Sequence, residues 1–186
     1  MSFTSDIKKE IIARGIGQGE GGLMEKKAAL SAFIRTSGFL GEKDGLPNFF
    51  IVSETENVAE FFMTIFSEIF NVELSITRAT MDRMSGRDKL LLQAPQSMAL
   101  EIMRELGLVK RTGGIRYGIS ARFKADEERM IAYVQGAFLG AGSCTVISFI
   151  KPSTIPSPAL SIGTITTFFP AILGAFIGIR GVSISS

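Results

Sequence analysis

Basic side chains gather at two predicted turns and have the clearest chemistry in this sequence. Lys and Arg side chains on exposed turns contact the phosphates of nucleic acid, and the affinity of such contacts falls as the salt concentration rises. The alternative is ordinary solvated turn charge. The candidate DNA-binding residues are Arg78, Arg83, Arg87 and Lys89 around one hairpin, and Lys110, Arg111 and Arg116 in a second turn.

Other side chains with familiar chemistry are scarce. The sequence has no histidine, which excludes the Ser-His-Asp triad and His-containing metal sites. Its single cysteine, Cys144, excludes an internal disulfide and a Cys-cluster metal site. We therefore expect no cofactor and no metal. The apolar stretch of a signal peptide is missing from the first ten residues, which together with the single cysteine predicts a cytoplasmic protein.

A glycine-rich segment, residues 15–22, contains a match to the dinucleotide fingerprint G-x-G-x-x-G between Gly17 and Gly22. The fingerprint binds phosphate only when it follows a strand and opens a helix. Here a predicted helix precedes it, and Glu20 would repel a phosphate group. The segment is therefore interpreted as a flexible linker.

The elements that must position these residues follow from apolar periodicity and from turn and cap residues. Glycines mark several of the ends, with Gly38 expected as the C′ residue of the second helix and Gly142 at the end of the last. Helices that alternate with paired strands predict an α+β fold built from antiparallel hairpins packed with helices. The predicted helices span residues 4–14, 23–37, 55–70, 95–106 and 126–141, and the strands span 49–52, 72–77 and 89–93.

Two of these helices share a row of small residues at i, i+4 spacing. A row without bulky side chains lets two helix backbones approach closely, and glycines inside a helix cost about 1 kcal/mol each unless they serve such a contact. We therefore expect the two helices to pack against each other. The rows are Ala28, Ala32 and Thr36 on the first helix and Ala132, Gly136 and Gly140 on the second.

The stretches 29–40 (ALSAFIRTSGFL) and 133–143 (YVQGAFLGAGS) resemble two degenerate LAGLIDADG helices. Together with the opening segment 2–10, Thr55-Glu-Asn and Glu105-Leu-Gly-Leu, they resemble the N-terminal half of the WhiA family over about residues 1–145. That family comprises bacterial regulators of sporulation and cell division with a scaffold like that of homing endonucleases. The resemblance implies a LAGLIDADG-like α+β fold whose second repeat is incomplete.

The resemblance also has consequences for activity. LAGLIDADG nucleases carry a metal-binding acid at the penultimate motif position, which hard cations need as an oxygen ligand. Ser37 and Ala141 occupy those two positions, so the resemblance implies a DNA-binding, regulatory module that is not an enzyme. Asp82 and Asp88 are interpreted as solvated turn residues. The alternatives are a protein-interaction scaffold that contacts a regulator without DNA and, less favoured, a LAGLIDADG endonuclease.

Three segments are expected along the chain: an N-terminal helix and linker (1–22), a LAGLIDADG-like domain (23–145) and an apolar tail (146–186). The helix-turn-helix domain of the WhiA family and the strands after the second motif helix are expected to be missing. All 18 Asp and Glu residues precede the tail, which has only Lys151 and Arg180 as charges. Its uncharged stretch 159–179 leaves three interpretations open: a frameshifted end, a membrane segment or a variant strand pair.

Overall fold

The computed structural model describes residues 3–19, 21–43, 45–79, 89–146 and 165–167. These residues form the α+β fold that the sequence predicts, with helices on one side of an antiparallel sheet. The helices are α1 (Phe3–Arg14), α2 (Leu23–Ser37), α3 (Glu56–Phe70), α4 (Gln96–Glu105) and α5 (Glu127–Ala141), with the short 3-10 helix η1 (Ala121–Phe123). The strands of the main sheet are β1 (Gly38–Lys43), β2 (Leu46–Ser53), β3 (Ser75–Ala79) and β4 (Lys89–Gln93).

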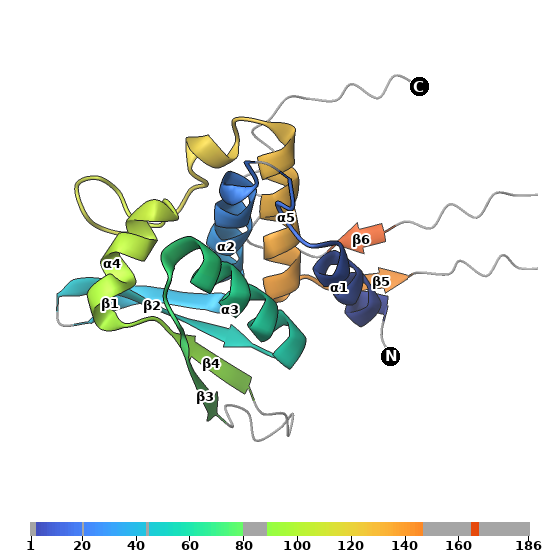
Figure 1. The fold of residues 1–186 in the computed structure, drawn as a ribbon, viewed down its shortest axis with the longest axis horizontal. Helices are drawn as coiled ribbons and strands as arrows, with labels where there is room; N and C mark the ends of the chain where they lie inside the picture. Colours follow the sequence, from blue (N-terminus) through green and yellow to red (C-terminus); the bar gives the residue numbers. More distant parts are fainter. Residues whose placement is uncertain (1–2, 20, 44, 80–88, 147–164, 168–186) are drawn as a thin grey trace, which may run out of the picture.

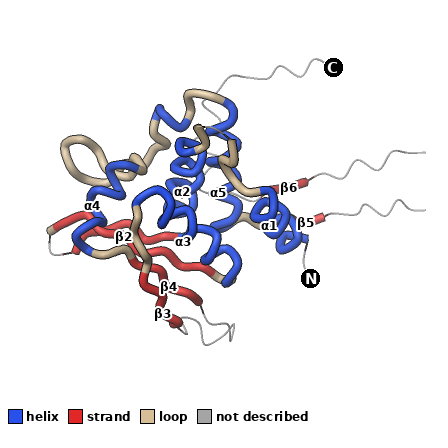
Figure 2. Tube along the Cα trace, in the orientation of Figure 1, coloured by secondary structure: helices blue, strands red, loops and turns tan. Residues whose placement is uncertain are grey.

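The main sheet has the strand order β1-β2-β4-β3, and every neighbouring pair is antiparallel. Figures 1 and 2 show the helices on one side of this sheet, while no described element lies against the other side. Side chains alternate between the two sides along each strand, so Phe49 and Ile51 are buried under the helices whereas Phe50 and Val52 are half-buried on the opposite side. We call that side the open face; the pairing register places on it Phe39, Phe50, Val52, Ser75, Thr77, Lys89, Leu91 and Gln93.

The hydrophobic core lies between the sheet and the helices and depends on phenylalanine. Phe33 of α2 and Phe62 of α3 are fully buried and stack with a centroid distance of 3.7 Å. Phe66 continues this layer to Phe49 on β2, at 6.3 Å between the ring centroids. Aromatic contacts of this kind stabilise a core beyond the area that they bury. They hold α2 and α3 against the covered face of the sheet.

Two helix termini differ from the predictions. Helix α1 begins at Phe3, so Thr4, Ser5 and Asp6 lie within its first turn instead of capping it. Gly38 does not adopt the left-handed conformation of a C′ residue: its φ of −101° and ψ of 167° lead directly into β1, which the sequence analysis missed. Glycine is needed there because a side chain would collide with the Ile34 and Phe50 carbonyl oxygens.

The glycine-rich loop after α1 forms a defined turn in its described residues. Ile16 is only 3% exposed and belongs to the core. Gly17 and Gly22 approach so closely that a side chain on either would collide with the backbone of the other. Gly17 also has a φ of 62°, in the left-handed region that favours glycine. The glycines therefore serve a tight turn between α1 and α2.

After α5 the chain forms a short strand, β5 (Cys144–Val146), which pairs antiparallel with β6 (Ile165–Thr167). Strands at this point were expected to be missing, and three described residues of the uncharged stretch 159–179 form one. The rest of that stretch, and most of the predicted tail, lies outside the described residues. No helix within the described part of the chain is both long and apolar enough to cross a membrane.

Candidate nucleic-acid interface

The two motif helices, α2 and α5, pack directly against each other through small residues (Figure 1). A side chain on Gly136 would collide with the backbone of Ala29, and one on Gly140 would collide with Thr36 and crowd Phe33. The residue that contacts Gly136, Ala29, thus follows Ala28 of the predicted row directly in the sequence. Ala28 and Ala32 of that row are fully buried. Ala132 is buried on α5.

The packing at Gly140 and Thr36 brings the last turns of the two helices together, where a LAGLIDADG nuclease would hold its metal. Ser37 is half-buried there, and its hydroxyl donates to the Phe33 carbonyl oxygen at 2.7 Å. Ala141 offers no polar side-chain atom. Among the described residues, no group of three or more Cys, Asp or Glu side chains could hold a metal ion. Asp82 and Asp88 lie outside the described residues.

The first predicted basic set is divided between the two sides of the sheet. Arg78 pairs with Leu90 in the register and points to the helix side, where its Nη2 lies 2.6 Å from Oε1 of Glu56. Lys89 is on the open face, with its Nζ 3.8 Å from Oε1 of Glu54. Arg83 and Arg87 lie outside the described residues. Lys89 directly precedes Leu90, the partner of Arg78, and successive residues of a strand face opposite sides of the sheet. Arg78 and Lys89 therefore do not form one basic surface.

The second predicted basic set comes together in a pocket. Lys110, Arg111 and Arg116 line it with two cations that the sequence analysis did not select, Arg104 at the end of α4 and Arg122 in η1. The pocket has a volume of about 410 Å³, and Gly107, Val109 and Ser120 complete its walls. No described carboxylate lines it. We call this site the basic pocket.

The loop that carries three of these cations has a defined backbone. Val109 and Ile115 pair as an isolated antiparallel bridge, and the Lys110 amide donates to the Gly114 carbonyl oxygen at 2.9 Å. Gly113 and Gly114 both have positive φ values, 84° and 75°, which glycine tolerates without strain. The tight turn places the Lys110 and Arg111 side chains at its exposed tip.

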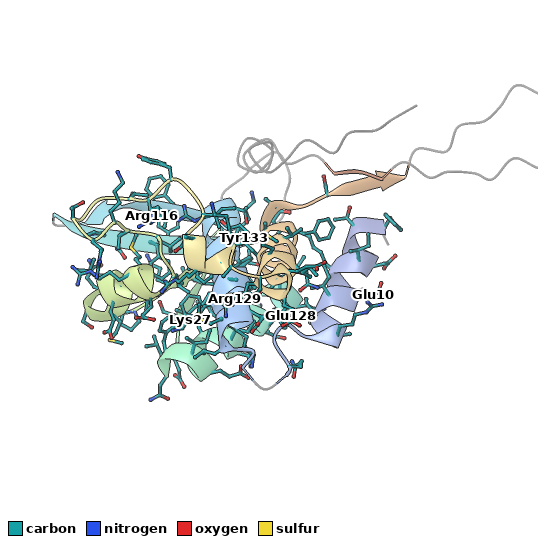
Figure 3. The ribbon with its side chains drawn as sticks, turned by 90° about the horizontal axis from the view of Figure 1, so that it is seen from above. Glu10, Lys27, Arg116, Glu128, Arg129 and Tyr133 are labelled. Atoms are coloured by element: carbon teal, nitrogen blue, oxygen red, sulfur yellow. The ribbon has the colours of Figure 1, made fainter. Side chains whose placement is uncertain are left out.

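Arg35 on α2 fixes this loop to the motif helices. Its Nη1 donates to the Arg116 carbonyl oxygen at 2.6 Å and its Nη2 donates to the Gly107 carbonyl oxygen at 3.1 Å. Burial lowers the pKa of Arg35, and burial raises the pKa of the neighbouring Tyr133 on α5. Arg116 and Tyr133 are both labelled in Figure 3. Sequence reasoning had no signal for Arg35, because both of its partners lie far along the chain.

Arg122 closes the other wall of the basic pocket. Its Nη2 donates to the carbonyl oxygens of Arg104 and Glu105, the last residues of α4. A cation at this end of a helix also complements the helix dipole. The Glu105 carboxylate lies 2.8 Å from Nζ of Lys27 on α2. Within the described part of the chain, the Nε atoms of Arg116 and Arg122 are buried without a hydrogen-bond partner, as are those of Arg35 and Arg129.

Comparison with known proteins gives a consistent picture. The chain is 31% identical over 145 residues to a probable cell division protein WhiA from Staphylococcus epidermidis, which covers 77% of this chain and 43% of the relative. The chain thus spans less than half the length of the curated relatives that it matches. No protein-family model matches it.

Solved structures show the same fold. Full-length DUF199/WhiA from Thermatoga maritima matches 78% of this chain with a TM-score of 0.51 at 17% identity, and the match covers 41% of that structure. The N-terminal LAGLIDADG domain of DUF199/WhiA matches 77% of the chain with a TM-score of 0.50 at 16% identity, covering 60% of that structure. Over about three quarters of its length, the chain is similar in sequence to WhiA proteins and in fold to their N-terminal LAGLIDADG domain.

Proposed function

We propose that this chain is a DNA-binding, regulatory module that contacts duplex DNA through the open face of its sheet and does not cleave it. The observation that carries the proposal is the uncovered side of a four-stranded antiparallel sheet in a LAGLIDADG-like fold (Figure 1). The relatives are called probable cell division proteins, so regulation of cell division is the corresponding cellular role.

On β3 and β4, the open face carries polar side chains that can contact a polar surface. Ser75, Thr77 and Gln93 are exposed on β3 and β4, and hydroxyl and amide groups can hydrogen-bond both phosphates and base edges. Lys89 lies at the same end as the 80–88 connection, whose sequence adds Arg83 and Arg87. These three cations supply the phosphate contacts in the proposal.

The ends of the motif helices support a role without cleavage. Phosphodiester cleavage by a hard cation needs carboxylate ligands that position both the ion and the attacking water. The Ser37 hydroxyl is engaged by its own helix, and Ala141 has no ligand atom. In this proposal, the pair of helices α2 and α5 has a structural role and orients the sheet.

A protein contact is the second candidate function, and one observation favours it. At the β1 end of the open face, Phe39 is 60% exposed and stacks on Phe50 with the ring centroids 5.2 Å apart. Exposed aromatic pairs are typical of protein interfaces. A Phe39→Ser variant that keeps DNA affinity but loses a protein partner would assign this end of the sheet to the partner.

A salt titration of DNA binding tests the main proposal. Each lost phosphate contact should reduce the slope of log K against log salt by up to about 0.9. The triple variant Arg83→Ala/Arg87→Ala/Lys89→Ala should therefore have a shallower slope and a lower affinity on unrelated duplexes alike, because phosphate contacts carry no sequence information.

Arg78→Ala is the matched control, because this cation lies on the covered side of the sheet and is paired with Glu56. It should leave the slope unchanged. The proposal is wrong if the parent chain shows no binding at about 50 mM salt, where phosphate contacts are strong. It is also wrong if the triple variant and Arg78→Ala change the slope equally.

A further inference from the structure

The basic pocket is a concentration of positive charge that the open-face proposal does not use. Arg104, Lys110, Arg111, Arg116 and Arg122 line one hollow of about 410 Å³, and no described carboxylate lines it. Mutual repulsion between like charges opposes such a cluster unless an anion offsets it. Arg78 and Lys89 of the first basic set each have a glutamate nearby, and so does Arg122, whose charge helps to lower the pKa of Glu105.

The walls of the pocket are held rigidly from three directions. Arg35 fixes the backbone at Gly107 and Arg116, and Arg122 fixes the end of α4. The Val109–Ile115 bridge fixes the turn between them. Donors held in place before a ligand arrives bind an anion without a large ordering cost.

The shape favours a small ligand over a duplex. Pockets for small molecules occupy about 300–1,000 Å³, and this one falls within that range. Duplex phosphates are spread along a backbone, whereas five cations around one hollow match several negative charges held within a few ångströms. The residues that line the pocket come from α4, the following loop and η1. These elements lie on the helix side of the sheet, away from the open face (Figure 1).

We infer that the basic pocket binds an oligophosphate group, either a free inorganic oligophosphate or the phosphate chain of a nucleotide. Charge-assisted hydrogen bonds from Arg and Lys to phosphate oxygens supply the affinity. Arg35, which holds the loop carbonyls from α2, is a positioning residue. The inference stands independently of DNA binding, because it uses none of the open-face residues.

The test measures binding of inorganic tripolyphosphate to the whole chain by calorimetry at about 50 mM salt, the regime in which phosphate contacts are strong. One molecule should bind per chain. The double variant Lys110→Ala/Arg111→Ala should weaken binding by about tenfold or more, since each charge-assisted hydrogen bond is strong. Both side chains are exposed at the tip of the turn, so the fold should persist, as circular dichroism can verify.

The double variant Arg78→Ala/Lys89→Ala is the matched control, since it removes the same amount of charge outside the pocket and should leave tripolyphosphate affinity unchanged. Binding of ATP with the same response and greater affinity would assign the site to nucleotides; equal or weaker ATP binding would assign it to inorganic oligophosphate. The inference is overturned if tripolyphosphate does not bind or if both double variants weaken it equally. It is also overturned if Lys110→Ala/Arg111→Ala impairs only duplex DNA binding.

Discussion

At the residue scale, the residues that matter most for activity are the last residues of the two motif helices. Ser37 and Ala141 lie where the LAGLIDADG resemblance requires acids, and the Ser37 hydroxyl donates to a carbonyl of its own helix. The sequence alone identifies these substitutions. It does not identify the ion pair between Arg78 and Glu56, because that contact joins a strand to the start of α3 across the fold.

We expect no DNA cleavage by the purified chain in the presence of Mg²⁺, because neither motif position offers a carboxylate for the metal. The measurement is incubation with supercoiled plasmid in Mg²⁺ and, in parallel, with a chelator. Specific cutting that the chelator abolishes would show that another set of ligands supports catalysis.

A second residue-scale prediction concerns the ion pair between Glu105 and Lys27, which ties α4 to α2. The hydrogen bond and charge of Lys27 lower the pKa of Glu105. A carboxylate whose pKa is lowered in the folded state stabilises the protein at pH values above its ordinary pKa, about 4.3. This stabilisation is lost as the pH falls through the lowered pKa. Because Glu105 is half-exposed, the contribution is at most about 1 kcal/mol.

The variant Glu105→Gln should therefore lower the free energy of unfolding at pH 7, and its difference from the parent should shrink towards zero at acidic pH. Urea unfolding of both proteins at several pH values measures this difference. A difference that stays constant from neutral to acidic pH would show that the carboxylate charge plays no part.

At the element scale, the close packing of α2 and α5 is the feature that organises the fold. Gly136 faces the backbone of Ala29, and backbone atoms cannot move aside as a flexible side chain can. Gly136→Ala should destabilise the protein by about 1–3 kcal/mol through overpacking, despite the better helix propensity of alanine. Gly118→Ala is the control, because nothing lies within 4 Å of a side chain at that exposed position. Equal stability of the two variants in urea unfolding would contradict the close contact.

Element boundaries show what the sequence could and could not reveal. Helix α2 and strand β4 follow from apolar spacing and match the predicted ranges, 23–37 and 89–93. Strand β1 could not be predicted, since Gly38 and Gly41 weaken its local propensity and its partner, β2, decides its conformation. The sequence indicated a basic turn with Lys110, Arg111 and Arg116 but did not predict a pocket. Its other cations come from α4 and η1, so their approach depends on tertiary packing.

At the scale of the whole molecule, the two sides of the sheet have different roles in this account. The covered side holds the core, the motif helices and the basic pocket, while the open face is offered to DNA (Figures 1 and 2). Neighbouring residues of β3 divide between these sides: Thr77 pairs with Leu91 on the open face, and Ile76 pairs with Leu92 on the covered side. Both side chains are exposed at the edge of the sheet.

This alternation allows the most direct test of DNA binding by the open face. Thr77→Glu and Ile76→Glu introduce the same negative charge one residue apart on opposite sides of β3. Duplex affinity at about 100 mM salt, where phosphate contacts still contribute strongly, should fall about tenfold or more for Thr77→Glu and change little for Ile76→Glu, with both variants folded by circular dichroism. Equal losses for the two variants, or a greater loss for Ile76→Glu, would contradict DNA binding through the open face.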